Sequence, residues 1–600
     1  MRKKYRGETE VSEFIPVTPE EARLQGWDKI DIILITGDAY IDHPSFGIAI
    51  LARVLKSAGF KVAIIPQPDW RSLDDFKRFG RPRLFFGISS GNMDSMVNKY
   101  TSLKKVRNDD MYSEYGKPFK RPDRAVIVYT QRVKEAYRDV PVVIGGIEAS
   151  LRRLAHYDYW SNSVRRSILL DSKADLLVYG MGESQIEEIA KRLNSGENIE
   201  NIQNIRGTVF PLGKNDKLTP LKDFEYTELP SYEDIVRDKR LFNEATLMLH
   251  NNSNPHSASA LIQQHDTRRV VQLPPAIPLS QSEIDKIYSL PFTRLPHPIY
   301  KGPIPAYETI KHSVTIMRGC FGGCSFCSIT VHQGRIIQSR SEESILNEIK
   351  KITTDKRFKG TISDLGGPTA NMYKMGCKDR ETQARCKRLS CIYPSICKKL
   401  KKDHKPLINL MKKAREIDGV KHLFISSGIR MDLALTDKNY IREIVFNHVS
   451  GHLKVAPEHV SKKVLRYMFK PNNNIFDNFI RLFYTYSKEA GKEQYLIPYF
   501  ISSHPGADLE AELELALYLK EKNLRPRQIQ DFLPTPMDIA TAMYYTEIEP
   551  IGGDNIYVAK KESEKKLHRA IIQFFKKENR EIVKRALKTI GCTDALKLLY

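Results

Sequence analysis

Three cysteines lie close enough in the chain to bind one metal cluster. Cys320, Cys324 and Cys327 have the spacing C-x3-C-x2-C, and Phe326 directly precedes the last of them. Three thiolates can hold three irons of a cubane [4Fe–4S] cluster and leave the fourth iron without a protein ligand. A structural zinc site would need four nitrogen or sulfur ligands, and reduced thiols without metal are a further alternative. We expect a [4Fe–4S] cluster whose open iron binds an exchangeable small molecule.

The residues around the cysteines predict a strand, a loop and a helix. Residues 313–317 have the composition of a short buried strand. A helix is expected to begin near Ser339 or Ser341, because Ser339 and Glu342 have the spacing of a capping box. This order resembles the first β/α unit of the radical S-adenosylmethionine (SAM) enzymes. The resemblance implies that SAM is the exchangeable ligand of the open iron.

Six strand candidates recur between residues 305 and 545, where we expect a radical SAM core domain. Helical stretches with polar faces separate them, so the pattern predicts a partial (β/α)6 barrel of the TIM type. In such barrels the site lies at the C-terminal ends of the strands. The candidates are 314–317, 361–364, 423–426, 453–455, 495–502 and 529–532.

Candidate SAM-binding residues follow these strands in order. In radical SAM folds, glycines after the second strand let the backbone approach the SAM amino group, so Gly366 and Gly367 are candidates; a plain turn is the alternative. Ser426 and Arg430 follow the third strand and are candidates for contacts with the SAM ribose and carboxylate. The aromatic residue before the last cysteine is expected beside the adenine. The predicted cofactor-binding set is Phe326, Gly366, Gly367, Ser426, Arg430 and Glu458. No catalytic residue is predicted.

Residues 1–200 predict a Rossmann-like N-terminal domain with an open parallel sheet. Two strand candidates, 31–36 and 61–65, flank a helix at 48–57, which makes a βαβ unit. The domain resembles the cobalamin-binding domains that precede some radical SAM cores. Further strands are expected at 83–88, 125–129, 141–145 and 174–179.

The cobalamin resemblance has a gap at the histidine. Base-off cobalamin binders use Asp-x-His-x-x-Gly, whereas here Asp42 and His43 are adjacent and three residues separate His43 from Gly47. We therefore do not expect bound cobalamin. A ligand crevice is still expected at the C-terminal edge of the sheet, with Asp38, Asp42 and His43 facing it.

The remaining segments connect and follow these domains. Residues 201–304 predict an irregular connector that is rich in proline toward its end, and residues 546–600 predict a basic helical tail. Apolar residues recur in the tail at three-four spacing. Packing on the barrel and binding of a partner or a phosphate backbone are both compatible with that pattern.

A second group of cysteines lies just after the second barrel strand. Cys377, Cys386, Cys391 and Cys397 are surrounded by lysines and arginines, which favour thiolates. Four soft ligands could bind zinc or an auxiliary iron–sulfur cluster. Their spacing matches no common zinc motif, so reduced structural or redox cysteines are the alternative that we favour. Cys592 stands alone near the end of the chain.

The composition indicates in which cellular compartment the protein works and what class of partner it binds. A chain of 600 residues with a formal net charge of +23 favours a polyanionic partner such as nucleic acid, although a lysine-rich solvated surface would give the same charge. No apolar run approaches the ~18–20 residues that span a bilayer, and the basic start lacks the apolar core of a secretory signal. Eight cysteines, several of them clustered, fit metal ligation in a reducing compartment. We expect a cytoplasmic protein.

The whole chain resembles the YgiQ-type family of radical SAM proteins. Residues 35–47, 67–80, 86–96 and the cysteine loop through residue 340 carry the resemblance. It implies one [4Fe–4S] cluster on Cys320, Cys324 and Cys327 with SAM as an exchangeable ligand. It supplies no substrate.

These features predict an enzyme. An electron from a low-potential donor of the flavodoxin or ferredoxin type is expected to reach the cluster and cleave SAM reductively to a 5′-deoxyadenosyl radical, which removes a hydrogen atom from a substrate. RNA modification is the leading substrate prediction because of the positive charge. The alternatives are a cobalamin-assisted methylase of small molecules and a non-catalytic iron–sulfur protein that binds nucleic acid or senses redox state.

Overall fold

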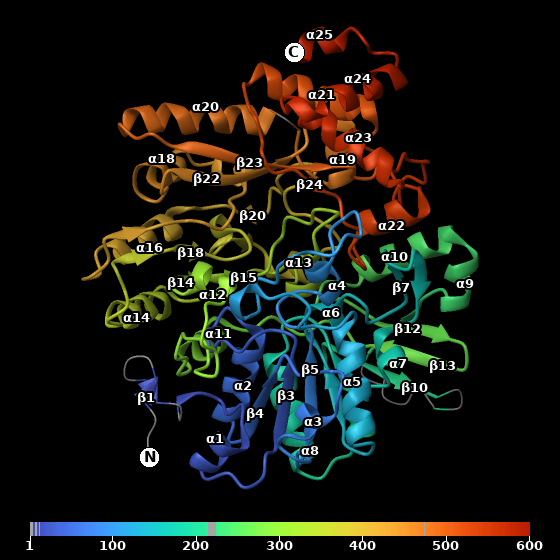
Figure 1. Ribbon diagram of the computed structural model, residues 1–600, viewed down its shortest axis with the longest axis vertical. Coiled ribbons are helices and arrows are strands. Elements are labelled where there is room, and N and C mark those ends of the chain that lie inside the picture. Colours follow the sequence, from blue (N-terminus) through green and yellow to red (C-terminus); the bar gives the residue numbers. More distant parts are fainter. Residues whose placement is uncertain (1–3, 6–8, 11–12, 214–215, 217–223, 473) are drawn as a thin grey trace. The chain divides into compact units, whose positions relative to one another are not determined.

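The chain forms two compact units, each with its own core. The computed structural model describes residues 4–5, 9–10, 13–213, 216, 224–472 and 474–600 (Figure 1). The first unit comprises the described residues of Met1–Leu241 together with Met248–Lys311 and Val331–Gly334. The second comprises Phe242–Leu247, His312–Thr330 and the described residues of Arg335–Tyr600.

A nine-stranded sheet forms the centre of the first unit. Five neighbouring strands are parallel, in the order β4-β3-β5-β6-β9, which is a doubly wound arrangement. Every residue of β3 and β4 is buried, as expected for parallel strands that carry helices on both faces. The five strands are β3 (Ile32–Thr36), β4 (Val62–Pro66), β5 (Phe85–Ser89), β6 (Val142–Ile144) and β9 (Leu176–Val178), and the helices that pack near them include α2 (Gly47–Ser57), α5 (Ala125–Ala136) and α8 (Glu183–Asn194) (Figure 1).

The strand predicted at 125–129 is wrong, because these residues begin helix α5. The buried residues of α5 recur at helical spacing, at Val126, Tyr129 and Val133. Its first N–H groups have side-chain partners: Ser95 Oγ accepts from Ala125 N–H at 3.1 Å, and Glu148 Oε1 accepts from Val126 N–H at 3.0 Å. Helix N-termini leave such donors unsatisfied within the helix, and these buried partners, distant in sequence, stabilise it here.

The segment predicted as an irregular connector adds strands to the same sheet. Its strand β10 pairs antiparallel with β9, β13 pairs with β10, and β12 pairs with β13. Strand β11 joins the edge by parallel pairing with β12. The bounds are β10 (Thr208–Leu212), β11 (Tyr226–Glu228), β12 (Ala260–His265) and β13 (Arg268–Gln272).

The second unit contains the six predicted β/α repeats as short parallel ladders. Strand β14 pairs with β18, β17 with β21, and β22 with β23, which pairs with β24. The strands are β14 (Ser313–Thr315), β17 (Thr361–Ile362), β18 (Asp364–Gly366), β21 (His422–Leu423), β22 (His452–Glu458), β23 (Tyr495–Ser502) and β24 (Gln530–Asp531). The helices between them are α14 (Glu342–Thr353), α16 (Lys405–Arg415), α18 (Lys438–Asn447), α19 (Lys462–Met468), α20 (Asn474–Glu489) and α21 (Leu509–Glu521).

Of the two serines proposed to start the first barrel helix, Ser341 is the N-cap. Its side chain accepts a hydrogen bond from Ser344 N–H at 3.0 Å. Ser339 instead lies in strand β16 (Gln338–Ser339), which pairs antiparallel with β15 (Met317–Arg318). This pairing closes the loop that contains the three cysteines.

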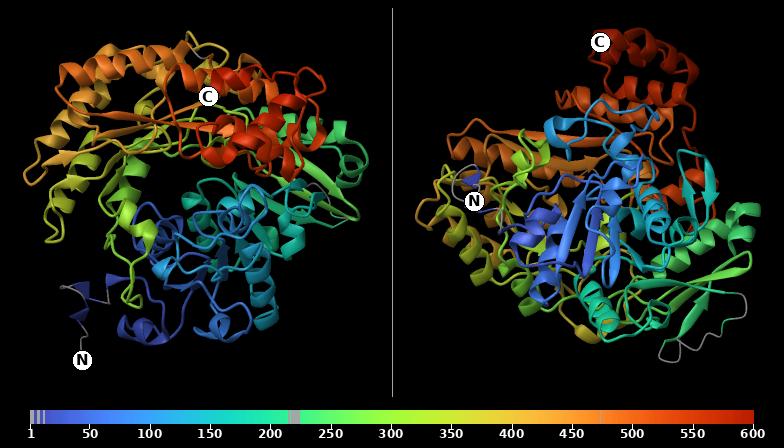
Figure 2. Two further views of the ribbon diagram at one scale, coloured as in Figure 1. Left: turned by 45° about the horizontal axis from the view of Figure 1, so that its top comes forward. Right: turned by 60° about the horizontal axis from the view of Figure 1, so that its bottom comes forward.

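The C-terminal helices pack on the barrel core. Ile571, Val583 and Leu587 are fully buried in the same apolar cluster as the barrel strands, and α23 contacts α21 (Figure 2). The helices are α22 (Ile539–Thr546), α23 (Glu562–Ile572), α24 (Arg580–Thr589) and α25 (Ala595–Leu599). Across the described parts of both units, we find no helix that is both long and apolar enough to pass through a membrane.

Candidate functional site

The loop that carries the three cysteines is anchored at its ends and in its middle. The β15–β16 pairing closes its ends. In its middle, Ser325 N–H donates to Met468 O at 3.2 Å, and Ser325 Oγ donates to Tyr467 O at 2.6 Å. Both acceptors lie at the C-terminal end of α19. The barrel therefore fixes the loop through a buried serine that stands between the second and third cysteines.

The three thiols interact electrostatically with one another. Burial raises the pKa of the Cys320 and Cys327 thiols, and the charge of Cys324 raises both further. One N–H group, from Gly322, donates to Cys320 Sγ at 3.4 Å. A thiolate is the form that binds metal, so a cationic centre between these sulfurs would remove the repulsion that opposes their ionisation.

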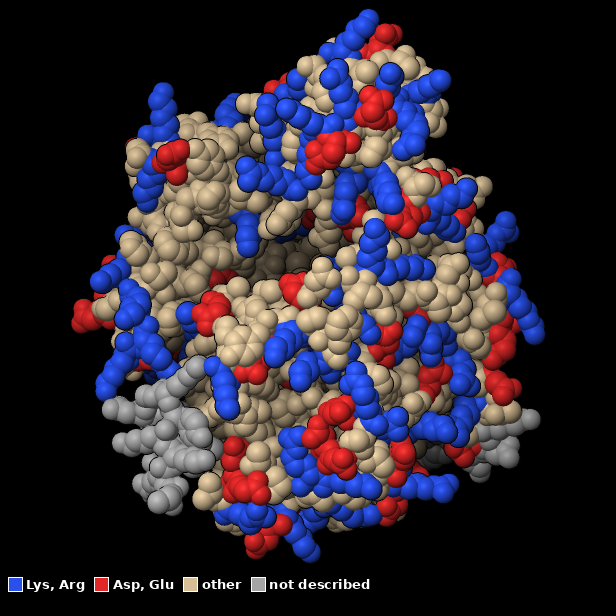
Figure 3. Space-filling model, viewed as in Figure 1, with Lys and Arg blue, Asp and Glu red and all other residues tan. Residues whose placement is uncertain are grey.

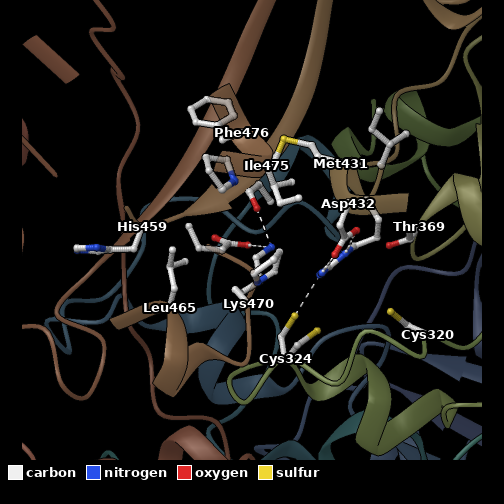
Figure 4. A pocket seen from close by; sticks show the side chains of 18 of the residues that line it. Cys320, Cys324, Thr369, Met431, Asp432, His459, Leu465, Lys470, Ile475 and Phe476 are labelled. Atoms are coloured by element: carbon white, nitrogen blue, oxygen red, sulfur yellow. Dashed lines mark hydrogen bonds and ion pairs between the residues drawn. The ribbon is translucent and has the colours of Figure 1, made fainter. Parts of the chain in front are cut away.

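The three cysteines form part of the wall of a cavity of about 180 Å³. Figure 4 shows Cys320 and Cys324 on one side of this cavity, with Asp432 and Lys470 across from them. Among the described residues, no three Cys, His, Asp or Glu side chains converge on one point where a single metal ion could bind. A cubane cluster instead distributes its thiolate ligands over several irons. Three thiols in the wall of one cavity are the donor set that a cubane with one open iron requires.

A buried arginine connects the cavity wall to the cysteines. Arg430 donates to both carboxylate oxygens of Asp432, at 3.2 and 2.6 Å, and its Nη1 donates to Cys324 Sγ at 3.4 Å (Figure 4). Burial opposes the charge of Arg430, but Asp432 and the nearby thiolates outweigh it and raise the pKa of the guanidinium. Burial likewise opposes the charge of Asp432, yet Arg430 lowers the pKa of that carboxyl. Asp432 thus holds the guanidinium of Arg430 against the cluster loop.

A second charged pair, Glu458 and Lys470, lines the same cavity. Lys470 Nζ lies 3.8 Å from Glu458 Oε1 and donates to Ala456 O at 2.7 Å. Burial raises the pKa of Glu458, while Lys470 and Arg430 act in the opposite direction. The cavity therefore combines two cationic groups with two carboxylates, an arrangement that can bind a zwitterionic ligand.

The predicted cofactor-binding residues fall into two groups. Phe326, Arg430 and Glu458 line the cavity together with the three cysteines. The other three are not among the residues that line it. Gly366 and Gly367 are closely packed: an added Cβ on Gly367 would lie 2.7 Å from Met317 O. The same atom on Gly366 would lie 2.7 Å from Asp364 Oδ2.

Ser426 lies in a separate hydrogen-bonded turn. Ser426 N–H donates to Asp364 Oδ1 at 2.8 Å, and its Oγ donates to Ser363 O at 2.7 Å. Asp364 also accepts from Ser427 N–H at 3.0 Å. These contacts tie the ends of the second and third barrel strands together.

Phe326 packs against a buried, neutral histidine. The ring centroids of Phe326 and His504 are 5.8 Å apart in an edge-to-face arrangement. Burial lowers the pKa of His504 to about 3, so its imidazole is uncharged near neutral pH. His504 in turn contacts Phe532, with centroids 5.1 Å apart. An apolar aromatic group thus supports the last turn of the cysteine loop.

The sequence did not point to three ionisable residues in or beside this site, Asp432, Lys470 and Asp538. Ser328 Oγ, next to the last cysteine, donates to Asp538 Oδ2 at 2.8 Å, and burial raises the pKa of Asp538 well above its usual range. Asp432 could have been found from its position two residues after Arg430. For Lys470 and Asp538 the sequence carries no signal, because each comes from a turn whose path depends on the fold.

Glu512 joins the barrel to the C-terminal helices. Its Oε1 lies 3.1 Å from His568 Nδ1 on α23, and its Oε2 lies 3.5 Å from His459 Nε2. Ser503 N–H donates to Glu512 at 2.9 Å. Burial alone would raise the pKa of Glu512, but the interactions with the two histidines outweigh it and lower that pKa to about 2. His459 contributes to the cavity wall, while its ring points away from the cysteines (Figure 4).

In the first unit, the expected ligand crevice is occupied by the protein's own side chains. Ligands of doubly wound sheets bind where the strand order reverses, which here is between β3 and β5. Asp38 fills this position: it accepts from Arg121 at 2.8 Å and is fully buried. Burial raises the pKa of Asp38 to about 6, although Arg121 favours its ionised form. Asp42 pairs with Arg53.

His43 is also enclosed and does not extend from the sheet edge. Its ring is fully buried, and its Nδ1 accepts from Ser45 N–H at 3.1 Å. Together with the two ion pairs, this contradicts the expectation that Asp38, Asp42 and His43 face an open crevice. Buried salt bridges hold Asp38 and Asp42, and a local turn holds Nδ1 of His43.

Basic residues are distributed widely over the surface. On the face in Figure 3, Lys and Arg side chains are interspersed with Asp and Glu and do not form one continuous stripe. The net charge of +23 therefore does not define a nucleic-acid groove on this face.

Comparison with known proteins matches residues 14–515 to radical SAM families. Residues 14–313 match the Radical SAM N-terminal family, residues 314–515 the Radical SAM superfamily, and residues 527–597 a domain of unknown function, DUF3362. The UPF0313 protein YgiQ of Salmonella typhimurium is 48% identical over 96% of this chain and 88% of its own. A UPF0313 protein of Methanocella arvoryzae is 50% identical over 97% and 96%.

Among solved structures, the similarity is distant. The radical SAM methyltransferase TsrM of Kitasatospora setae, with cobalamin and a [4Fe–4S] cluster bound, gives a TM-score of 0.48 at 10% identity, over 93% of this chain and 99% of that one. The cobalamin-dependent SAM radical enzyme OxsB, with aqua-cobalamin bound, gives 0.45 at 11% identity, over 88% and 56%.

Proposed function

Because the chain belongs to the YgiQ-type UPF0313 family of radical SAM enzymes, we propose that Cys320, Cys324 and Cys327 bind a [4Fe–4S] cluster and that the adjacent cavity binds SAM. The observation that carries this proposal is the shared cavity wall: all three thiols border the space that Arg430, Glu458 and Lys470 also line. Three thiolates leave one iron of a cubane open, and SAM bound there supplies, after reduction, a 5′-deoxyadenosyl radical.

The charged residues of the cavity would bind and orient the methionine part of SAM. Its α-carboxylate suits the guanidinium of Arg430 or the ammonium of Lys470, and its ammonium suits the carboxylate of Glu458. Asp432 holds Arg430 in place through two hydrogen bonds. Phe326, on the cluster loop and in the cavity wall, offers an apolar surface for the adenine.

Apolar side chains also line the cavity. Phe476, Leu465 and Ile475 contribute to its wall, and an apolar wall that keeps water from the reacting atoms would protect a reactive radical from side reactions. The electron must come from a low-potential donor, for which a flavodoxin or ferredoxin is the expected class.

The direct test is anaerobic reconstitution followed by addition of SAM and dithionite. The wild-type protein should form 5′-deoxyadenosine, and SAM should change the electron paramagnetic resonance (EPR) spectrum of the reduced cluster. Cys320→Ala, Cys324→Ala and Cys327→Ala should each abolish both signals. Cys592→Ala, which changes a half-buried cysteine in the tail, is the matched control. Survival of both signals in all three variants would refute the assignment.

RNA is the substrate class that the net charge of +23 favours. Comparing the tRNA modification profile and the metabolite profile of a deletion strain with those of the parent tests it directly. Loss of a single modified nucleoside supports RNA, whereas a changed small metabolite supports a methylase of small molecules. A cluster that forms normally but neither responds to SAM nor yields 5′-deoxyadenosine would instead indicate a non-catalytic iron–sulfur protein.

A further inference from the structure

A segment of the second unit that is closed by two short strands contains four cysteines. Strand β19 (Gly376–Cys377) pairs antiparallel with β20 (Leu400–Lys401), so that Cys377 lies opposite Leu400. Leu400 N–H donates to Cys397 O at 3.0 Å. The first and last cysteines of the group are thereby placed at the same closed end of the loop, although 19 residues separate them in the sequence.

The other cysteines of the loop are near one another. Cys397 N–H donates to Cys391 O at 2.8 Å. Burial raises the pKa of Cys391, and the charges of Cys386 and Cys397 raise it further. Lys399 interacts with the charges of both Cys377 and Cys397. Cys391 is thus close enough to Cys386 and Cys397 to interact electrostatically with both, as Cys320 and Cys327 do with Cys324.

Positive charge surrounds this second group. The guanidinium of Arg335 interacts electrostatically with the thiolates of Cys386 and Cys391. Arg388 donates to the backbone oxygens of Ser390, Tyr393 and Ser395, at 3.0 to 3.1 Å. Cationic groups favour the thiolate form that binds metal. All eight cysteines of the chain lie in the described residues, and none of them is in a disulfide.

The loop also packs directly on the cluster loop. Cys391 N–H donates to Phe321 O at 3.0 Å, and the buried Ser390 donates through Oγ to Gly322 O at 2.7 Å. Phe321 and Gly322 lie between the first two cysteines of the C-x3-C-x2-C motif. A group bound by the second set of cysteines would therefore be adjacent to the first.

We propose that Cys377, Cys386, Cys391 and Cys397 bind a second iron–sulfur cluster, in addition to the one on Cys320, Cys324 and Cys327. Zinc fits less well because structural zinc sites use closely paired ligands, commonly C-x2-4-C, whereas these cysteines are separated by eight, four and five residues. This second site does not depend on the reaction at the first.

The test uses a chain from which the first cluster site has been removed. We expect the C320A/C324A/C327A variant, reconstituted anaerobically with iron and sulfide, to retain about four irons and four sulfides per chain, the content of one cubane. Its reduced EPR signal should not change when SAM is added. Adding C386A and C391A to this variant should remove the remaining iron and sulfide.

Two results would overturn the second cluster. One is a triple variant that keeps its fold by circular dichroism but contains no iron or sulfide. The other is stoichiometric zinc without sulfide, as purified or after exposure to both metals. If the triple variant does not fold, the intact protein decides: about eight irons per chain, with about four in C386A/C391A and eight in C592A, supports two clusters. About four irons in all three proteins refutes the second one.

Discussion

Gly323 provides a sharp test of how the second cysteine loop packs on the cluster loop. Gly323 and Gly491 have nearly the same backbone conformation, with φ of +61° and +62°. Alanine in this region costs about 1–2 kcal/mol. Their surroundings differ: a Cβ on Gly491 would meet nothing within 4 Å, whereas a Cβ on Gly323 would lie 2.1 Å from Leu389 O. Gly491→Ala is therefore the matched control for Gly323→Ala.

The magnitude follows from this contact. Ordinary contact begins at 3.4 Å, so Leu389 O must retreat by about 1.3 Å (3.4 minus 2.1). Leu389 precedes Ser390 and Cys391, and such a movement would break their hydrogen bonds to Gly322 O and Phe321 O. Each bond contributes about 1 kcal/mol net. We expect Gly323→Ala to destabilise the second unit by about 3–4 kcal/mol and Gly491→Ala by about 1–2 kcal/mol.

Thermal unfolding and iron content together measure the effect. Both variants should be reconstituted anaerobically and compared with the wild type by circular dichroism and by iron and sulfide analysis. Gly323→Ala should lower both the unfolding midpoint and the iron content, because it displaces the backbone that carries both sets of cysteines. Equal midpoints and equal iron contents in the two variants would refute the packing described for Leu389, Ser390 and Cys391.

Three further predictions concern the cavity and its supports. Arg430→Ala leaves the buried carboxylate of Asp432 unpaired and should lower the free energy of unfolding by about 3–5 kcal/mol. The double variant R430A/D432A should recover much of the unfolding midpoint but not the response of the EPR spectrum to SAM. Recovery of both would show that Arg430 acts only on stability. Because the pKa of Glu512 is lowered to about 2, its contribution to the free energy of unfolding is complete above its ordinary pKa near 4.5 and is lost as the pH falls from there toward 2. In denaturant titrations, Glu512→Gln should reduce this pH-dependent change in the free energy of unfolding by up to about 3 kcal/mol. An unchanged profile would contradict the contacts with His459 and His568. Gly367→Ala would place a Cβ 2.7 Å from Met317 O, whereas a Cβ on Gly376 would meet nothing within 4 Å. The rate of 5′-deoxyadenosine formation should fall at least tenfold in Gly367→Ala and stay near wild type in Gly376→Ala. Equal rates would exclude tight packing at the end of the second strand.

Much of the barrel could be predicted because its signals are local. Strand β23 occupies the predicted residues 495–502, and each of the other five candidates overlaps a strand of the structure. The cysteine motif likewise depends only on spacing within eight residues. Such features can be predicted without knowledge of the fold, since strand composition and ligand spacing are properties of short segments.

Features that depend on distant partners could not be predicted. Helix α5 has its first N–H groups satisfied by Ser95 and Glu148, which lie 30 and 22 residues away. Asp38 and His43 have the residue types of a ligand site, yet Arg121, 83 residues from Asp38, pairs with one and a local turn encloses the other. The sequence therefore identifies polar residues at the end of a strand. Whether such a side chain is available to a ligand depends on the protein residues that contact it in the fold.

Glu458 was a candidate from the sequence, but the orientation of its side chain in the cavity wall depends on the fold. Its φ of +68° is unusual for a glutamate, and a residue held in this region costs about 1–3 kcal/mol. The cost coincides with an irregularity in the β22–β23 ladder between Val455 and Glu458. A regular strand would continue its alternation at this point, so the bulge re-aims the carboxylate. This strain at a buried carboxylate, which lies beside Lys470 in the cavity wall, supports the proposal that Glu458 contacts SAM.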